Sequence, residues 1–259
     1  MAQVPQDFID LASRLADASR PILRSYYRRK LEVDIKSDAS PVTQADREAE
    51  AAIRTLINAT FPEHGIFGEE FGKERADAEY VWVLDPLDGT RAFVTGRPTF
   101  GTLIALTRNG APLLGVIDMP VLGDRWIGAV GMPTTLNGEP VQSRVCGKLA
   151  EAYLSASIPL MFDTPEKRQK FESVQAKARS TTFGGDCYQY GMVATGFLDI
   201  VIECSLVEYD YLALTPIIEG AGGRITDWRG NGLKMGSGDR VVAVGDARLL
   251  EQALPVLAG

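Results

Sequence analysis

The sequence predicts an α/β fold, because segments with helical and strand patterns alternate along the whole chain. Apolar residues recur at helical spacing in some segments and form short runs in others. The 259 residues are enough for one large domain or two small ones. Residues 1–259 contain no internal repeat, no low-complexity segment and no long linker. We therefore expect a single unit with a soft internal division near residue 147.

The first half opens with two expected helices. Apolar residues at helical spacing predict the first helix over residues 7–29. An alternating pattern predicts a strand over residues 31–35, and a polar loop is expected over residues 36–41. Thr43 followed by Asp46 resembles a capping signal, which places the start of the second helix there.

Short strands are expected to form the centre of the first half. They cover residues 66–67, 80–84, 101–106 and 113–119. The last three follow one another closely in the chain, which favours a mixed or antiparallel sheet. The stretch over residues 120–146 is expected to be rich in turns.

The second half restarts the alternation of strands and helices. Its expected strands cover residues 153–157, 181–184, 198–203, 224–228 and 241–244. Its expected helices cover residues 165–178, 188–195, 211–221 and 246–257. Gly222 and Gly223 are expected to stop the third of these helices.

Composition excludes several classes of function. The net charge of −7 argues against a nucleic acid as the partner. No stretch approaches the ~20 apolar residues of a membrane span, and residues 1–10 lack the features of a secretory signal. The three cysteines are odd in number and lack CxxC spacing, so we expect reduced thiols and a cytoplasmic protein. A single histidine, His64, excludes a histidine-rich metal site.

The run DPLDGT at residues 85–90 is the most informative motif. An apolar strand delivers Asp85 at its end, and Pro86 is expected to force the chain out of the strand. Gly89 allows a tight turn. Asp85 and Asp88 then point into one small volume, where like charges repel unless a cation lies between them. Hard oxygen ligands of this kind suit Mg²⁺, which takes further oxygens from a substrate phosphate.

Three other acidic residues each have a structural explanation when considered alone. Glu69 belongs to an acidic pair of the kind found in solvated loops. Asp46 fits the first turn of a helix, and Asp210 fits the N-cap of the helix expected over residues 211–221. Their occurrence in order with residues 85–90 favours a shared metal site instead.

These motifs together resemble the inositol monophosphatase family of Mg²⁺-dependent, lithium-sensitive phosphomonoesterases. The matching runs are GEE at 68–70, DPLDGT at 85–90, YDYLA at 209–213 and EGAGG at 219–223. Within the family, residues 101–106 and 185–196 are most similar to the histidinol-phosphate phosphatase branch. The resemblance covers nearly the whole chain. It implies a sandwich of alternating helix and sheet layers, with the site between the two halves, and a homodimer.

The resemblance also implies a metal site of two or three Mg²⁺ ions. The implied ligands are the carboxylates of Glu69, Asp85, Asp88 and Asp210 and the backbone carbonyl of Leu87. Asp85 is implied as a ligand of two ions. Thr90 and Asp46 are implied as a hydroxyl–carboxylate pair that accepts a proton from the metal-activated water that hydrolyses the ester.

The implied substrate is a small phosphate ester, and histidinol phosphate is favoured. Gly89, Thr90 and Asp210 are expected to contact it near the phosphate. The family places a substrate-contacting Glu at the position of Glu203, and Asp186 lies in the turn that resembles the histidinol-phosphatase branch. Extra carboxylates suit the amine and the imidazole of histidinol phosphate. Asp186 can instead cap the helix expected near residue 188.

Two positions depart from the family's pattern, and the location of one lysine is left open between two alternatives. Tyr209 stands where the family often has Trp, and Ala92 stands where it often has Asn. Neither departure removes an implied metal ligand. Lys36 fits a solvated loop, although the resemblance also suggests a place near the site.

Other functions remain as alternatives from the sequence alone. One is a phosphatase that acts on inositol 1-phosphate or on many small phosphate esters. A second is an aspartyl-phosphate phosphatase of the haloacid-dehalogenase type, which is disfavoured because Asp85 and Asp88 are separated by two residues and not by one. A third is a metal-binding scaffold, which would have no need of Asp46 and Thr90.

Overall fold

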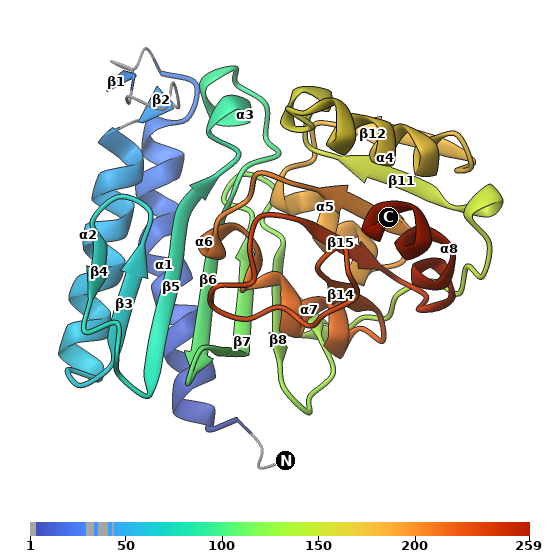
Figure 1. The fold of residues 1–259 in the computed structure, drawn as a ribbon. Helices are drawn as coiled ribbons and strands as arrows, with labels where there is room; N and C mark the ends of the chain where they lie inside the picture. Colours follow the sequence, from blue (N-terminus) through green and yellow to red (C-terminus); the bar gives the residue numbers. More distant parts are fainter. Residues whose placement is uncertain (1–3, 30–33, 36–40, 43) are drawn as a thin grey trace.

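The computed structural model describes residues 4–29, 34–35, 41–42 and 44–259 (Figure 1). The helices are α1 (Gln6–Tyr26), α2 (Gln44–Thr60), α3 (Thr90–Val94), α4 (Pro165–Gln175), α5 (Cys187–Ala194), α6 (Glu208–Tyr211), α7 (Leu214–Gly220) and α8 (Arg248–Ala258), with short 3₁₀ turns at Leu149–Glu151 and Pro159–Met161. Among the residues of these ranges, no helix combines the length and apolar character needed to cross a membrane.

The strands fall into three sheets. Those of the first half are β1 (Asp34–Ile35), β2 (Pro41–Val42), β3 (Gly65–Gly68), β4 (Gly72–Glu74), β5 (Tyr80–Asp88), β6 (Gly101–Arg108), β7 (Ala111–Asp118), β8 (Arg125–Ala129), β9 (Thr135–Leu136) and β10 (Glu139–Pro140). Those of the second half are β11 (Tyr153–Ala156), β12 (Ser180–Phe183), β13 (Ile200–Glu203), β14 (Arg224–Thr226) and β15 (Val241–Val244). The pair β1–β2 is a small separate sheet.

The first large sheet has the order β10-β9-β8-β7-β6-β5-β3-β4. Only its β3–β5 pair is parallel, so the expected mixed sheet is confirmed. Helices α1 and α2 cover one of its faces (Figure 1), where Leu15, Ile53 and Trp82 belong to one buried apolar cluster. The apolar faces of α1 and α2, which the spacing of their apolar residues predicts, therefore pack against this sheet.

The second large sheet has the order β12-β11-β13-β15-β14, and its first three strands run parallel. Helices α5 and α7 lie between the two sheets, and their apolar side chains share one core with both. Helices α4 and α8 cover the outer face of the second sheet (Figure 1). The expected layered α/β fold is thus confirmed, with helix and sheet layers alternating.

Three details of the sequence prediction were wrong, and the first concerns Pro86. Strand β5 does not end at this proline. It continues to Asp88 with a shifted register, so that Asp85 pairs with Leu103 but Asp88 pairs with Gly101. One extra residue on β5 forms a bulge, where a proline that lacks an N–H is tolerated.

The second error is an omission, because residues 120–146 contain three strands, besides the expected turns, that the sequence did not predict. Strand β8 pairs along its whole length with β7. The sequence did not predict this strand, because Gly128 interrupts its apolar pattern. The reason for this glycine is tertiary: a Cβ there would lie 2.5 Å from the Cα of Ile217 in α7.

The third error concerns the single helix expected over residues 211–221, because residues 208–220 form two helices, α6 and α7. The break falls at Leu212 and Ala213, although both keep right-handed helical dihedrals. Pro216 accounts for it, because a proline has no N–H for the carbonyl of Leu212 four residues earlier. Asp210 therefore lies within α6 and is not the N-cap of the longer helix.

Some predictions fall outside the described residues. These are the start of the strand expected over residues 31–35, most of the loop with Lys36, and the capping residue Thr43.

Candidate active site

A cleft of about 740 Å³ lies between the two halves of the chain. It is lined by nearly all the residues predicted for the site, namely Glu69, Asp85, Leu87, Asp88, Gly89, Thr90, Asp186, Glu203 and Asp210. Strand β5 and the turn after it supply one wall, and β13 and α6 supply the other. The residues predicted for the site therefore come together at a cleft between the two halves.

Three carboxylates gather at one end of the cleft. Asp85, Asp88 and Asp210 each place an oxygen within 4.8 Å of the others. Burial, and then the charges of Glu69 and Asp88, raise the pKa of Asp85 well above its usual range. Burial also raises the pKa of Asp210 to about 7. A bound cation would remove this unfavourable crowding of negative charge.

Backbone amides orient each of these carboxylates. Asp85 accepts a hydrogen bond from the Leu87 amide at 3.0 Å. Asp88 accepts one from the Cys187 amide at 2.6 Å, and Asp210 accepts one from the Val207 amide at 2.7 Å. Each side chain is therefore fixed by the peptide backbone near it, and Asp88 is tied across the cleft to the first residue of α5.

A second acidic group adjoins the first. Asp46, Glu69 and Glu70 place carboxylate oxygens within 4.8 Å of one another. Asp46 does not line the cleft, but it is buried and its charge contributes to the raised pKa of Asp85. The sequence did not identify Glu70 as a site residue, because the resemblance assigned only the first glutamate of the pair.

The turn that carries Thr90 is compact. Gly89 has a φ of +82°, a conformation that favours glycine. A Cβ at this position would lie 3.2 Å from the Cβ of Asp186, so the two chain segments pack closely. The Thr90 hydroxyl donates to the Leu87 carbonyl at 3.2 Å. Its pairing with Asp46 stays a prediction.

Glu203 is buried in a hydrogen-bond network beside the acidic cluster. It accepts from the Ser157 amide at 2.7 Å, from the Gln189 side chain at 2.8 Å and from the Tyr190 hydroxyl at 2.8 Å. Burial raises its pKa, and these donors oppose the rise. The network fixes the carboxylate where β13 ends.

Asp186 has a strained backbone conformation, and nearby charged side chains shift its pKa. Its φ is +43°, and although it precedes α5 its side chain makes no capping hydrogen bond. The structure therefore gives no support to the capping explanation. Burial and the charge of Glu203 raise the pKa of Asp186 to about 6, whereas the charges of Arg97 and Arg91 lower it.

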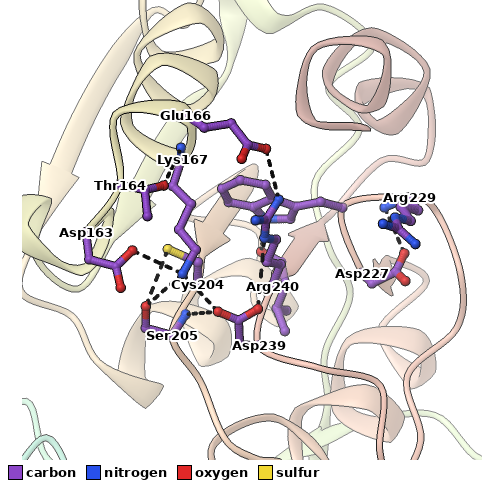
Figure 2. Close-up of polar contacts among 12 residues, drawn as sticks. Asp163, Thr164, Glu166, Lys167, Cys204, Ser205, Asp227, Arg229, Asp239 and Arg240 are labelled. Carbon is purple, nitrogen blue, oxygen red and sulfur yellow. Dashed lines mark hydrogen bonds and ion pairs between the residues drawn. The ribbon is translucent and has the colours of Figure 1, made fainter. Parts of the chain in front are cut away.

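A buried lysine anchors part of the cleft wall (Figure 2). Lys167 lies 3.0 Å from Asp239 and 3.1 Å from Asp163, and it donates to the Ser205 hydroxyl at 3.3 Å. Ser205 has a φ of +62°, and its hydroxyl donates to the Met161 carbonyl. Both Ser205 and Met161 line the cleft. Sequence reasoning missed this anchor, because Lys167 belongs to a highly charged helix.

Other residues noted in the sequence have structural roles. His64 is buried and accepts a hydrogen bond from the Trp82 indole at 3.1 Å, away from the cleft. Cys146, Cys187 and Cys204 are unpaired and buried, as expected. Tyr209 lines the cleft and packs edge-on against Phe67. Ala92 is buried in α3.

The residues present fit a hard divalent cation. The two clusters of possible ligands among the described residues consist of carboxylates alone, the Leu87 carbonyl lies on the same cleft, and the described lining includes no histidine. Such oxygens are those that Mg²⁺ prefers over transition metals. Crowded carboxylates with raised pKa values are the expected state of such a site without its cation.

Comparisons with known proteins agree with this chemistry. The model of the inositol monophosphatase family matches residues 5–257. The bifunctional phosphatase IMPL2, chloroplastic, of Arabidopsis thaliana is 47% identical over 96% of this chain and 75% of its own length. A histidinol-phosphatase of Chlorobaculum parvum is 37% identical over 86% of each chain. A solved structure of an inositol monophosphatase from Zymomonas mobilis has a TM-score of 0.91 and 46% identity over 98% of each chain.

Proposed function

The chain belongs to the inositol monophosphatase family and is a phosphoric monoester hydrolase, and we propose that its substrate is histidinol phosphate. The observation that carries the proposal is the pair Asp186 and Glu203. Both line the cleft beside the acidic cluster, and neither is needed as an implied metal ligand. A cleft with two further carboxylates suits a substrate with a cationic amine and an imidazole.

The relatives give independent support. Three of them, from Chlorobaculum parvum, Mycobacterium tuberculosis and Streptomyces coelicolor, are histidinol-phosphatases with 37%, 34% and 31% identity to this chain. Family membership also removes two alternatives, the aspartyl-phosphate phosphatase and the scaffold without catalysis. Hydrolysis of inositol 1-phosphate is the competing proposal, favoured by the similarity to the Zymomonas mobilis protein.

The family consists of metal-dependent phosphatases, typically with Mg²⁺. We propose that the carboxylates of Glu69, Asp85, Asp88 and Asp210, with the Leu87 carbonyl, hold two or three of these ions. When bound, Mg²⁺ would lower the pKa of a coordinated water and neutralise the negative charge of the phosphate. The amides of the turn at Gly89 and Thr90 contact the phosphate.

The chain's own residues move the proton in this proposal. Thr90 Oγ1 accepts a proton from the attacking water while its own hydroxyl proton passes to the buried carboxylate of Asp46. Asp46 is suited to this task because its carboxylate is buried and lies close to those of Glu69 and Glu70.

Two variants test the substrate. Asp186→Asn and Glu203→Gln should each raise KM for histidinol phosphate about tenfold, since a charge-assisted hydrogen bond contributes about 1.5–3 kcal/mol. The same variants should change KM for p-nitrophenyl phosphate much less, because this ester lacks a cationic end. Equal effects on both esters would contradict recognition of the cationic end.

Three further properties are proposed from family resemblance and composition. We propose a homodimer in the cytoplasm, with lithium inhibiting the enzyme. The three unpaired cysteines are consistent with a reducing compartment. Light scattering coupled to gel filtration would measure the oligomeric state directly, and a mass of 28.1 kDa would contradict the dimer.

A further inference from the structure

Glu50 lies at the end of the site where Glu69 is found, on the same helix as Asp46 and one turn later. It is a fully buried carboxylate, with 0% of its surface exposed. Its Oε2 accepts the Glu70 amide at 2.8 Å, and its Oε1 accepts the Phe71 amide at 3.2 Å. A buried carboxylate on α2 thus binds the backbone of the turn that follows β3.

This turn carries Glu69, whose two flanking peptide groups are both fixed. The amide before it donates to the Leu84 carbonyl of β5 at 3.1 Å. The amide after it, which belongs to Glu70, donates to Glu50. The sheet therefore constrains the backbone on the N-terminal side of Glu69, and Glu50 constrains it on the C-terminal side. The direction of the Glu69 side chain follows from this backbone conformation.

Gly68 shows how closely Glu50 fits this turn. A Cβ at position 68 would lie 2.0 Å from Oε1 of Glu50, so only glycine leaves room for the carboxylate. The negative charge of Glu50 is compensated by Arg54, whose Nε lies 2.8 Å from Oε1. Arg54 also donates to the Gly72 carbonyl at the far end of the turn.

We propose that Glu50 is a positioning residue, which holds Glu69 in the orientation that binds Mg²⁺. This inference rests on the proposed metal site and extends it to a residue that does not touch the metal. Partners that orient metal ligands typically change metal affinity by about 10- to 100-fold when they are removed. Loss of the Glu50 carboxylate should therefore weaken Mg²⁺ binding.

The alternative is that Glu50 serves only the stability of α2, through its ion pair with Arg54. Arg54→Gln is the matched control, because it breaks the same ion pair, together with the Arg54 bond to the Gly72 carbonyl, and leaves the two bonds from Glu50 to the turn. The double variant Glu50→Gln with Arg54→Gln leaves no uncompensated buried charge. It keeps the test available if Glu50→Gln alone is poorly folded.

The experiment is calorimetric titration of the full-length, metal-free protein with Mg²⁺, with a melting curve for each variant. We expect Glu50→Gln and the double variant to raise the Kd for Mg²⁺ about tenfold or more, and Arg54→Gln to change it less than about threefold. Hydrolysis by Glu50→Gln should need more Mg²⁺ and recover most of its rate at saturating Mg²⁺.

The outcomes separate this inference from the proposed function. An unchanged Kd in a folded Glu50→Gln or double variant, or an equal increase in Arg54→Gln, overturns the positioning role alone. A wild-type protein that binds no Mg²⁺ overturns the metal site and this inference together. The titration needs no substrate, so a wrong choice of phosphate ester leaves its result valid.

Discussion

Thr90 and Asp46 are proposed to act as one proton-accepting unit. Thr90→Ala and Asp46→Asn should therefore each lower kcat about 10²- to 10⁴-fold while KM changes little. Residues that act together are not additive, so the double variant should cost little beyond the worse single variant. Steady-state kinetics with histidinol phosphate measures this, and fully additive losses in kcat would show that the two side chains work separately.

Asp210 links the acidic cluster to the pH dependence of stability. Its pKa rises from the ordinary 3.8 to about 7 in the folded, metal-free protein, so the folded state binds this proton more tightly than the unfolded state. Its contribution to stability is fully present below pH 3.8 and is lost as the pH rises through about 7.

Comparison with Asp210→Asn isolates this effect. In EDTA, the melting temperature of the wild-type protein minus that of Asp210→Asn should fall between about pH 4 and pH 8. Excess Mg²⁺ should restore the melting temperature of the wild-type protein near pH 8, because the cation binds the charged carboxylates. A difference that is constant with pH would contradict the crowding of charge around Asp210.

The sequence predicted the residues of the acidic motifs but not the residues that hold them. Asp85 and Asp88 could be identified because a short motif places both in one turn. Glu50 could not, since a glutamate on an amphipathic helix normally faces solvent, and its burial arises from the contact of α2 with the turn after β3. Lys167 was missed for the same reason.

Among the secondary-structure elements, α4 is expected to support the cleft through Lys167. Lys167→Met removes the cation shared by Asp163, Asp239 and Ser205, and it should loosen the wall formed with Met161. We expect the melting temperature to fall by several degrees, because a lost hydrogen-bond network costs about 1–3 kcal/mol. KM for histidinol phosphate should also rise.

Lys170→Met on the same helix is the control. Lys170 pairs with Glu166 at 2.8 Å and does not line the cleft. Its removal should leave KM unchanged and should lower the melting temperature less, since Lys170 has among the described residues only this one carboxylate partner, Glu166, whose side chain is exposed. If the two variants behave alike in both assays, Lys167 has no special role in the wall.

The elements that the sequence predicted well are those whose apolar pattern is local. Helices α1 and α2 and strands β6 and β7 are examples, since each has a regular apolar period. Strand β8 and the bulge in β5 depend on tertiary contacts, whereas the break between α6 and α7 follows from Pro216, whose effect an apolar period does not show. Gly128 is needed for the close approach of α7, and the bulge at Pro86 depends on pairing with β6. The local spacing of apolar residues cannot predict such tertiary requirements.

At the scale of the whole molecule, the cleft exists because two sheets are joined by a shared helix layer. The first half supplies Glu69, Asp85 and Asp88, and the second half supplies Asp186, Glu203 and Asp210. Family resemblance could place this arrangement from sequence, whereas composition and periodicity alone predicted only an α/β fold. In the proposed function, the carboxylates that the second half adds to the cleft, Asp186 and Glu203, select the substrate.

Turnover of two phosphate esters tests the central claim most directly. Initial rates of phosphate release from histidinol phosphate and from inositol 1-phosphate should be measured at equal, low concentrations in Mg²⁺, with an EDTA control. We predict faster release from histidinol phosphate and no release in EDTA. Faster release from inositol 1-phosphate would contradict the proposed substrate, and undiminished release in EDTA would contradict the metal site.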